Sequence, residues 1–128
     1  MSVQLNHTIV YCRDQEASAA FLTGILGLPP ASRFAHFQVV PAANGVSLDY
    51  LQTDRPIARQ HYAFLVGEAD FDAAFARITE RSLPYWADPG QSIRDEINTR
   101  DGGRGLYFQD PDGHLMEILT RPYGSGGT

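Results

Sequence analysis

Two histidines and two carboxylates occupy matching places in the two halves of this sequence. His7 and His61 each open an alternating, strand-like run, whereas Asp49 and Glu117 each interrupt an otherwise apolar run. Neighbouring residues of a strand point to opposite faces of a sheet. If the apolar neighbours face the helices, the four polar side chains therefore converge on the other face. Imidazole and carboxylate together suit Mn, Fe, Ni, Zn or Co, so the pattern predicts a site for one divalent metal ion whose identity stays open.

Each of these residues also has a structural explanation. A lone histidine in a strand is more often a hydrogen-bonded packing residue than a ligand, but two histidines at matching positions need a common reason. Glu117 inside an apolar run is costly unless it is paired or bound to a metal. Asp49 is shorter and pairs equally well with an arginine, so its role as a fourth ligand stays open. His114, an odd number of residues from Glu117, is expected to face away as a turn or surface residue.

The elements that must position these side chains repeat as well. Asp14 and Asp70 are expected to cap the two helices, and Gly27 is expected to end the first of them. The Asn44–Gly45 pair and the run 110–113 carry the residues of tight turns. The pattern predicts strand material over 32–40, 46–52, 84–86, 105–109 and 114–120. Each half thus has a strand, a helix, and then two or three strands.

The 128 residues fit one domain. We predict this domain over residues 1–123, with modules at about 1–55 and 60–121 and a flexible tail at 124–128. Each module is small for independent stability. We therefore predict an α+β fold in which two βαβββ modules form curved mixed sheets, with helices on one face and a cleft at the other. Chance similarity between two strand–helix units is the alternative explanation of the repeat.

Composition excludes several classes of partner. The formal net charge of −5 and a pI near 5.2 leave no basic face for nucleic acid or an anionic membrane surface. No apolar run approaches the ~20 residues of a membrane span, and the first residues do not resemble a signal peptide. Cys12 is the single cysteine, which excludes an intrachain disulfide. We expect Cys12 to be a small buried residue, and the protein to act in the cytoplasm on a small molecule.

The closing run, residues 106–117, resembles the last motif of the vicinal-oxygen-chelate superfamily, which holds glyoxalase I, extradiol dioxygenases, fosfomycin-resistance enzymes and bleomycin-binding proteins. The runs 6–10 and 61–64 resemble two other strands of that family, and the resemblance extends from Leu5 to about Tyr123. It implies a metal held by His7, His61 and Glu117. In several small members the modules pair between chains, which implies a homodimer. Whether the site lies within one chain or is shared between subunits stays open.

The family's chemistries differ in what they ask of this chain. Tyr107 stands where extradiol dioxygenases keep a tyrosine, but the run 98–104 lacks the acid–base histidine that they place ahead of it, which disfavours ring cleavage. A glyoxalase-like lyase or isomerase needs a metal that polarises two adjacent oxygens of its substrate. This metal-dependent enzyme is the main prediction, with Asp49 and Tyr107 as catalytic residues. Arg100 and Arg104 are predicted to bind an anionic group of the substrate.

Three alternatives remain beside that prediction. They are an extradiol-type dioxygenase, a fosfomycin-type epoxide-opening enzyme and a bleomycin-like drug-sequestering protein. The sequestering relatives lack the metal ligands, so the presence of His7, His61 and Glu117 argues against the last of these. The sequence leaves the substrate, the metal and the type of reaction open.

Overall fold

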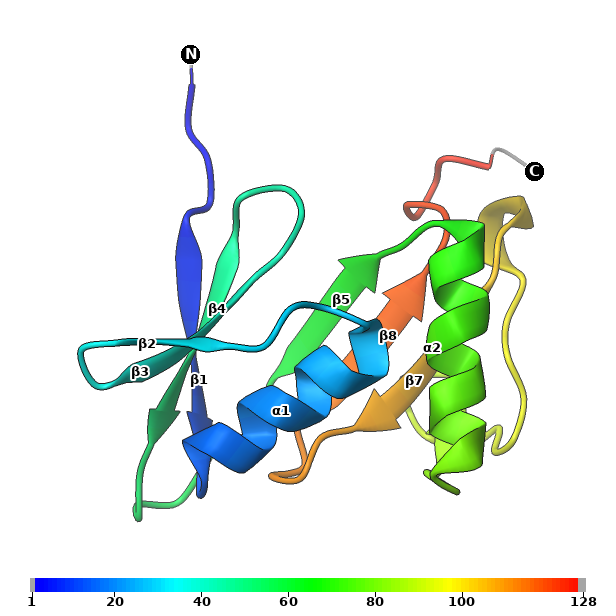
Figure 1. Ribbon diagram of the computed structural model, residues 1–128. Helices are drawn as coiled ribbons and strands as arrows, with labels where there is room; N and C mark the ends of the chain where they lie inside the picture. The colour runs from blue at the N-terminus through cyan, green and yellow to red at the C-terminus, as the bar shows by residue number, and fades with distance from the viewer. Residues whose placement is uncertain (1, 127–128) are drawn as a thin grey trace. The chain divides into compact units, whose positions relative to one another are not determined.

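The computed structural model describes residues 2–126, and these residues confirm the α+β class. They form two four-stranded mixed sheets, each with one helix (Figure 1). The elements in chain order are β1 His7–Cys12, α1 Gln15–Leu26, β2 Ser32–Phe34, β3 Phe37–Pro41, β4 Ser47–Gln52, β5 His61–Leu65, α2 Glu68–Glu80, β6 Tyr85–Trp86, the 3-10 helix η1 Arg100–Gly102, β7 Gly105–Gln109 and β8 Leu115–Leu119.

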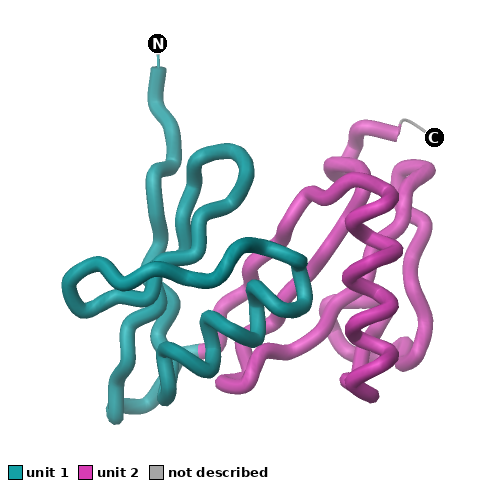
Figure 2. The backbone as a smooth tube through the Cα atoms, viewed as in Figure 1, with its two compact units in different colours: residues 1–58 teal, residues 59–128 magenta. Residues whose placement is uncertain are grey.

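The chain separates into two compact units, unit 1 (residues 1–58) and unit 2 (residues 59–128), shown in Figure 2. The boundary lies inside the linker expected at 52–60. Both units follow the order βαβββ, with strand orders β1-β4-β3-β2 and β5-β8-β7-β6. In each unit the first strand runs parallel to the last, and the last runs antiparallel to the one before it. The sequence repeat is therefore also a repeat of topology. That the units form one domain over 1–123 stays a prediction.

The first helix begins and ends where the sequence indicates. The Asp14 carboxylate accepts a hydrogen bond from the Ala17 N–H at 3.0 Å, which satisfies one of the free donors at the helix start. Gly27 follows the last turn with φ 72°, a conformation that glycine adopts without strain. The expected strand material at 32–40 divides into β2 and β3, because the chain turns back at Ala35, where φ is 52°.

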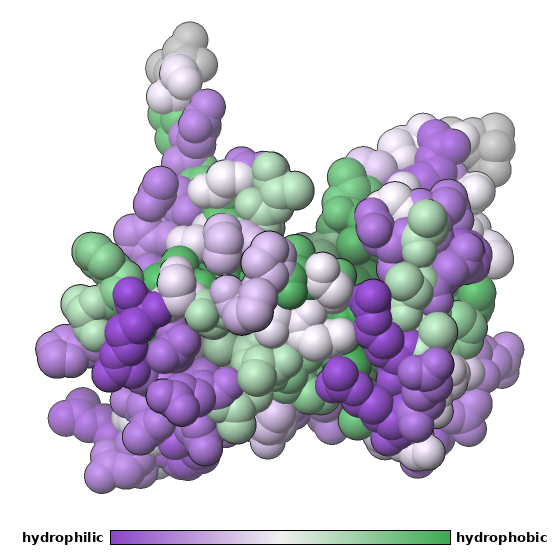
Figure 3. Space-filling model, in the orientation of Figure 1, coloured by the Kyte–Doolittle hydropathy of each residue, from purple (hydrophilic) through white to green (hydrophobic). Residues whose placement is uncertain are grey.

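The second helix corrects one prediction. Asp70 does not cap it, because α2 begins at Glu68 and the N-cap is Gly67, which has no side chain to donate or accept a hydrogen bond. The extended backbone of Gly67 starts the helix earlier, and the Phe71 N–H donates to the Gly67 carbonyl at 2.9 Å. Asp70 instead lies in the first turn, where a carboxylate favours the helix dipole. On the face of unit 2 that Figure 3 shows, hydrophilic residues are mixed with mildly hydrophobic ones over α2.

The turn before β8 is confirmed, but the environment of His114 is not as predicted. Gly113 has φ 86°, and the Asp110 N–H donates to the His114 carbonyl at 3.0 Å. His114 is only 1% exposed, and its Nδ1 accepts from the Gln60 N–H at 3.1 Å. His114 and Met116 are two residues apart, so they lie on the same face of the chain, opposite Glu117. That face packs into the core and not against solvent, which is why His114 is buried.

The ends of the chain complete this description. Within residues 2–126, no helix is long and apolar enough to span a membrane. At the predicted tail, the Ser125 N–H donates to the Pro122 carbonyl at 3.1 Å and the Gly126 N–H to Asp101 Oδ1 at 3.4 Å. Gly127 and Thr128, the end of that tail, and Met1 lie outside the described residues. The flexibility of the tail stays a prediction.

Candidate metal and substrate site

A histidine and a carboxylate meet on one face of the sheet in unit 2. His61 begins β5, and Glu117 lies on the parallel neighbour β8, two residues beyond the position paired with His61. His61 Nε2 and Glu117 Oε1 are 3.0 Å apart. The glutamate is 1% exposed, whereas the imidazole is 43% exposed. A buried carboxylate requires partners, so this pair is open to solvent only through the histidine.

A chain of hydroxyl groups joins the second oxygen of Glu117 to an arginine. The Tyr123 hydroxyl donates to Glu117 Oε2. It lies 3.0 Å from the hydroxyl of Tyr107, a buried residue of β7. Arg100 Nη1 donates to that Tyr107 hydroxyl at 2.9 Å. The five side chains from His61 to Arg100 thus form one hydrogen-bonded series, and four of them were singled out from the sequence.

The electrostatics of this series follow from its order. Loss of solvent raises the pKa of the Tyr123 hydroxyl well above its ordinary value, and the hydrogen bonds with Glu117 and Tyr107 raise it further. The hydrogen bond to Tyr107 is the main cause that raises the pKa of the Arg100 guanidinium. Arg100 therefore stays a cation and Tyr123 a neutral donor throughout the physiological range.

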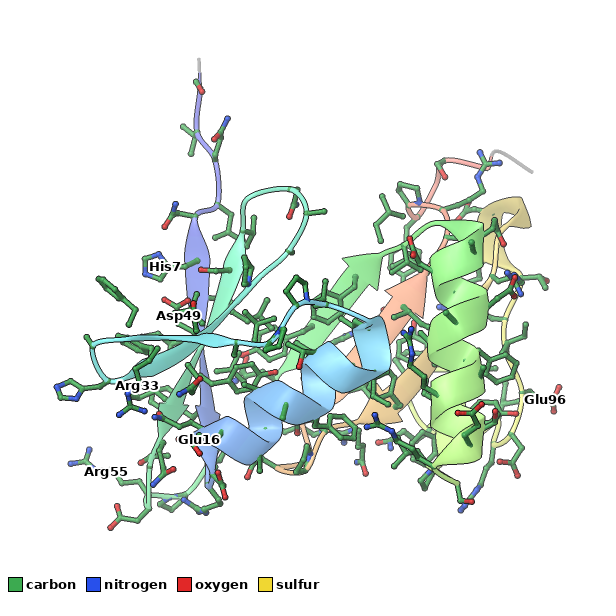
Figure 4. The ribbon with its side chains drawn as sticks, in the orientation of Figure 1. His7, Glu16, Arg33, Asp49, Arg55 and Glu96 are labelled. Atoms are coloured by element: carbon green, nitrogen blue, oxygen red, sulfur yellow. The ribbon has the colours of Figure 1, made fainter. Side chains whose placement is uncertain are left out.

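Unit 1 holds the matching pair in a more open setting. His7 begins β1, and Asp49 lies two residues beyond its paired position on β4. Figure 4 shows both side chains on the same side of β1. They line a pocket of about 470 Å³, together with Asn6, Ser32, Phe34, Phe37, Val39 and Ser47. Asp49 Oδ1 accepts from the Ser47 hydroxyl at 2.9 Å.

The tautomer of His7 suits a ligand. His7 Nδ1 lies 2.7 Å from Asn6 Oδ1, and an amide oxygen only accepts, so Nδ1 carries the proton. The lone pair of the neutral ring is then on Nε2. Histidines that bind metals commonly donate their other ring N–H to such an oxygen.

The donors present fit a divalent metal only in part. Two ligands bonded to one ion at about 2.1 Å and at right angles would be about 3 Å apart, which matches the separation of His61 Nε2 and Glu117 Oε1. The same separation is also that of an ordinary hydrogen bond. Among residues 2–126 no three His, Cys, Asp or Glu side chains gather at one point. The addition of His7 to the pair in unit 2 stays a prediction.

The two arginines predicted to bind substrate have different surroundings. Arg104 pairs with Glu68 Oε1 and Asp72 Oδ1, both at 2.8 Å, and its guanidinium lies 4.5 Å from the centre of the Phe71 ring. These contacts link Arg104, which precedes β7, to α2, and its binding of substrate stays a prediction. Arg100, bonded to Tyr107, lies beside the candidate site.

Tyr123 is the residue that the sequence analysis missed. It comes after the last strand in a short segment between Pro122 and Gly124, where no periodic pattern assigns a face to a side chain. Tyr123 follows Glu117 by six residues in the sequence. That spacing alone does not predict a contact between the two side chains.

Comparison with known proteins now gives these features a context. The model of the "Glyoxalase/Bleomycin resistance protein/Dioxygenase superfamily" matches residues 4–118. A solved structure named "Oxidase ChaP-H2" is 60% identical, with a TM-score of 0.96 over 99% of this chain and 100% of that one. The "Metallothiol transferase FosB" of Lysinibacillus sphaericus (strain C3-41) is 29% identical over 94% of this chain and 84% of its own. The fosfomycin resistance protein FosX from Listeria monocytogenes is 21% identical, with a TM-score of 0.73 over 98% and 99% of the two chains, and shows the shared fold alone.

These findings confirm the family resemblance that was drawn from the closing run. They also support an enzyme. The lyase or isomerase activity that was the main prediction is not confirmed. Compared with that main prediction, the fosfomycin-type alternative has better support in the names of the curated relatives.

Proposed function

We propose that this chain, which belongs to the glyoxalase/bleomycin resistance protein/dioxygenase superfamily, is a metal-dependent oxidase. The main support is the 60% identity, over nearly the whole length of both chains, with a protein named as an oxidase. The observation in the structure that carries the proposal is the buried Glu117 held against His61, with a tyrosine and an arginine beside the pair. The relative named FosB is 29% identical, about half that value.

In this proposal His61, Glu117 and His7 hold one divalent ion per site. When bound, the metal supplies a Lewis acid that polarises two adjacent oxygens of the substrate, and a centre that exchanges electrons with an oxidant. Arg100 binds the substrate, with its guanidinium facing an anionic oxygen. The buried Tyr107, predicted as a catalytic residue, positions that guanidinium through its hydroxyl. Asp49 accepts the proton that the substrate releases on binding.

The assembly and location are parts of the same proposal. A homodimer would give each site ligands from more than one βαβββ module, and within residues 2–126 no three such side chains gather at one point. The protein acts in the cytoplasm on a small molecule and not on nucleic acid or a membrane. Light scattering at micromolar concentration tests the assembly, and a particle of monomer mass would refute a site shared between subunits.

The central test loads metal and measures consumption of oxygen. The protein is purified under nitrogen, loaded separately with Fe(II), Mn, Co, Ni or Zn, and given catechols, hydroquinones and hydroxylated polycyclic aromatics. We expect oxygen uptake with at least one redox-active metal, none with Zn, and none with Glu117→Gln under any metal. Equal uptake by wild type and Glu117→Gln would overturn the proposal.

A thiol transferase is the second candidate, because the curated relatives named FosB and FosA match 92–94% of this chain at 27–29% identity. Such an enzyme would add a thiolate to an epoxide without an oxidant. The Mn(II)-loaded protein is incubated with fosfomycin and either glutathione or cysteine under nitrogen. Formation of the thiol adduct above the rate of free Mn(II) favours the transferase, whereas oxygen-dependent turnover without adduct favours the oxidase.

A further inference from the structure

We propose that Tyr123 is a positioning residue for Glu117, and that its hydroxyl holds Oε2 so that Oε1 is directed at His61 and the metal. The inference rests on the proposed function in one respect, since it requires that Glu117 bind a metal. It adds a residue that the family's ligand set does not contain. It assigns a role to the segment beyond the last strand.

The directions of the hydrogen bonds support this role. The Tyr123 hydroxyl donates to Glu117 Oε2, so its single proton points to that oxygen. The Tyr123 oxygen must then accept from the Tyr107 hydroxyl, 3.0 Å away. The Tyr107 oxygen in turn accepts from Arg100 Nη1 at 2.9 Å. The donors of Arg100, Tyr107 and Tyr123 therefore all point toward the glutamate, and Tyr123 contacts it directly at Oε2.

The two oxygens of Glu117 consequently have different surroundings. Oε2 accepts a hydrogen bond from the Tyr123 hydroxyl, whereas Oε1 lies 3.0 Å from His61 Nε2. A carboxylate constrained in this way presents one oxygen to an ion and keeps its plane fixed. Hydrogen bonds to a ligand commonly fix its orientation and tune its affinity for the metal.

The exposure of Tyr123 argues that its role is not in the core. The residue is 58% exposed, so its ring contributes little buried apolar surface. Its hydroxyl is nevertheless bonded to one of the most buried carboxylates of the chain. Because the ring of Tyr123 is exposed to solvent and its hydroxyl is hydrogen-bonded to Glu117, the side chain acts mainly through the hydroxyl.

The segment that carries Tyr123 is tied down on both sides. The Ser125 N–H donates to the Pro122 carbonyl at 3.1 Å, and Arg121 Nη2 donates to the Ser125 carbonyl at 3.2 Å. The Gly126 N–H reaches Asp101 Oδ1, in the same 3-10 helix, η1, that carries Arg100. The segments that carry Tyr123 and Arg100 are therefore also joined by a hydrogen bond outside the hydroxyl series.

The test compares two variants that each remove one hydroxyl. Tyr123→Phe deletes the donor to Glu117, and Tyr85→Phe deletes a hydroxyl of the same unit that only donates to the Asp95 carbonyl at 3.3 Å. Metal-free proteins are titrated with Co(II), and the visible absorption of the bound ion gives both the dissociation constant and the coordination geometry. We expect Tyr123→Phe to weaken binding about 10- to 100-fold and to change the spectrum at saturation. Tyr85→Phe should match the wild type in both.

Two further measurements keep the outcomes distinct. Circular dichroism shows whether Tyr123→Phe is folded, and 4-aminophenylalanine at position 123 restores a donor on the same ring, which should recover most of the affinity. Equal affinity and an identical spectrum for wild type and Tyr123→Phe would overturn the inference while leaving the metal site intact. Failure of the wild type to bind Co(II), Fe(II) or Mn(II) would overturn the proposed function, and this inference with it.

Discussion

Equivalent positions in the two units hold different side chains, and the register of the strands makes the comparison direct. Asp49 pairs with Val39 across β3 and β4, and Glu117 pairs with Tyr107 across β7 and β8. His7 and His61 begin the corresponding parallel strands. In unit 1 these positions line an open pocket of about 470 Å³. In unit 2 they belong to a hydrogen-bonded series around the buried Glu117 and Tyr107.

The difference comes from the segments that connect and extend the strands. Two residues, Ala35 and His36, join β2 to β3, whereas the long stretch 87–104 joins β6 to β7 and carries Arg100. Unit 2 also continues past β8 into the segment with Tyr123. Through Arg100 and Tyr123, these segments bring hydrogen-bond donors to Tyr107 and Glu117. The two units therefore share a topology but differ at this face. In unit 1 it lines an open pocket, and in unit 2 it holds Glu117 in a network of hydrogen bonds.

The largest expected effect separates the two carboxylates. Glu117→Gln should reduce the metal content to background, because an amide is a poor substitute for a charged ligand. Asp49→Asn should retain the metal, since the proposed ligands remain. Elemental analysis of proteins purified in parallel provides the measurement. Loss of metal from both variants to the same extent would make Asp49 a ligand and remove the proposed division of labour.

The next effect concerns packing at paired positions. Tyr107→Val gives unit 2 the side chain of unit 1 and opens a cavity at a buried site, which should cost about 2–4 kcal/mol of unfolding free energy. Val39→Ala removes two methyl groups from a half-buried pocket wall and should cost about 1 kcal/mol. Urea denaturation of both variants tests the difference. Equal costs would show that the unit 2 face is no better packed than the unit 1 face.

A smaller effect distinguishes the helix starts. Asp14→Ala removes the side-chain cap of α1 and should destabilise the protein by about 1 kcal/mol. Gly67→Ser adds a capping hydroxyl to α2 and should stabilise by a few tenths of that, roughly 0.3 kcal/mol. Thermal melts monitored by circular dichroism resolve the two directions. A loss of stability in Gly67→Ser would indicate that contact between the added carbon and Asp70, near 3.3 Å, outweighs the new cap.

The smallest effect is a dependence on alkaline pH. The folded state raises the pKa of Tyr123 above the value of about 10 expected for the unfolded chain. The stability that this hydroxyl contributes is therefore fully present below pH 10 and is lost as pH rises toward the folded-state value. Denaturation midpoints between about pH 9.5 and pH 11.5 should fall more steeply for wild type than for Tyr123→Phe. Parallel slopes would argue that the hydroxyl is not engaged in the folded protein.

The local patterns in the sequence predicted most of the fold. Alternation placed His7 and Glu117 on the correct strands, and Gly27 and the 110–113 turn ended elements where expected. The errors arose where neighbours along the chain do not decide the outcome. The start of α2 depends on the backbone of Gly67. The odd spacing between His114 and Glu117 predicts that they lie on opposite faces of the strand. It does not predict whether the face of His114 meets the solvent or the core.

The candidate site was predictable only as far as strand periodicity reaches. Periodicity identified His61 and Glu117, which the structure places 3.0 Å apart. It carried no information on the long β6–β7 connection, so it could not separate Arg100, beside Tyr107, from Arg104, which binds α2. Contacts made by irregular segments depend on the folded path of the chain, and Tyr123 belongs to such a segment.

The single cysteine has a practical consequence. Cys12 ends β1 and is fully buried, and its thiol is the one such group in the whole sequence. A thiol-specific label can react only when that part of unit 1 opens. The rate of labelling in native buffer therefore reports the opening of one half of the duplicated fold, while hydrogen exchange at β8 reports the other. The rates at which the two units open can therefore be measured separately without an engineered probe.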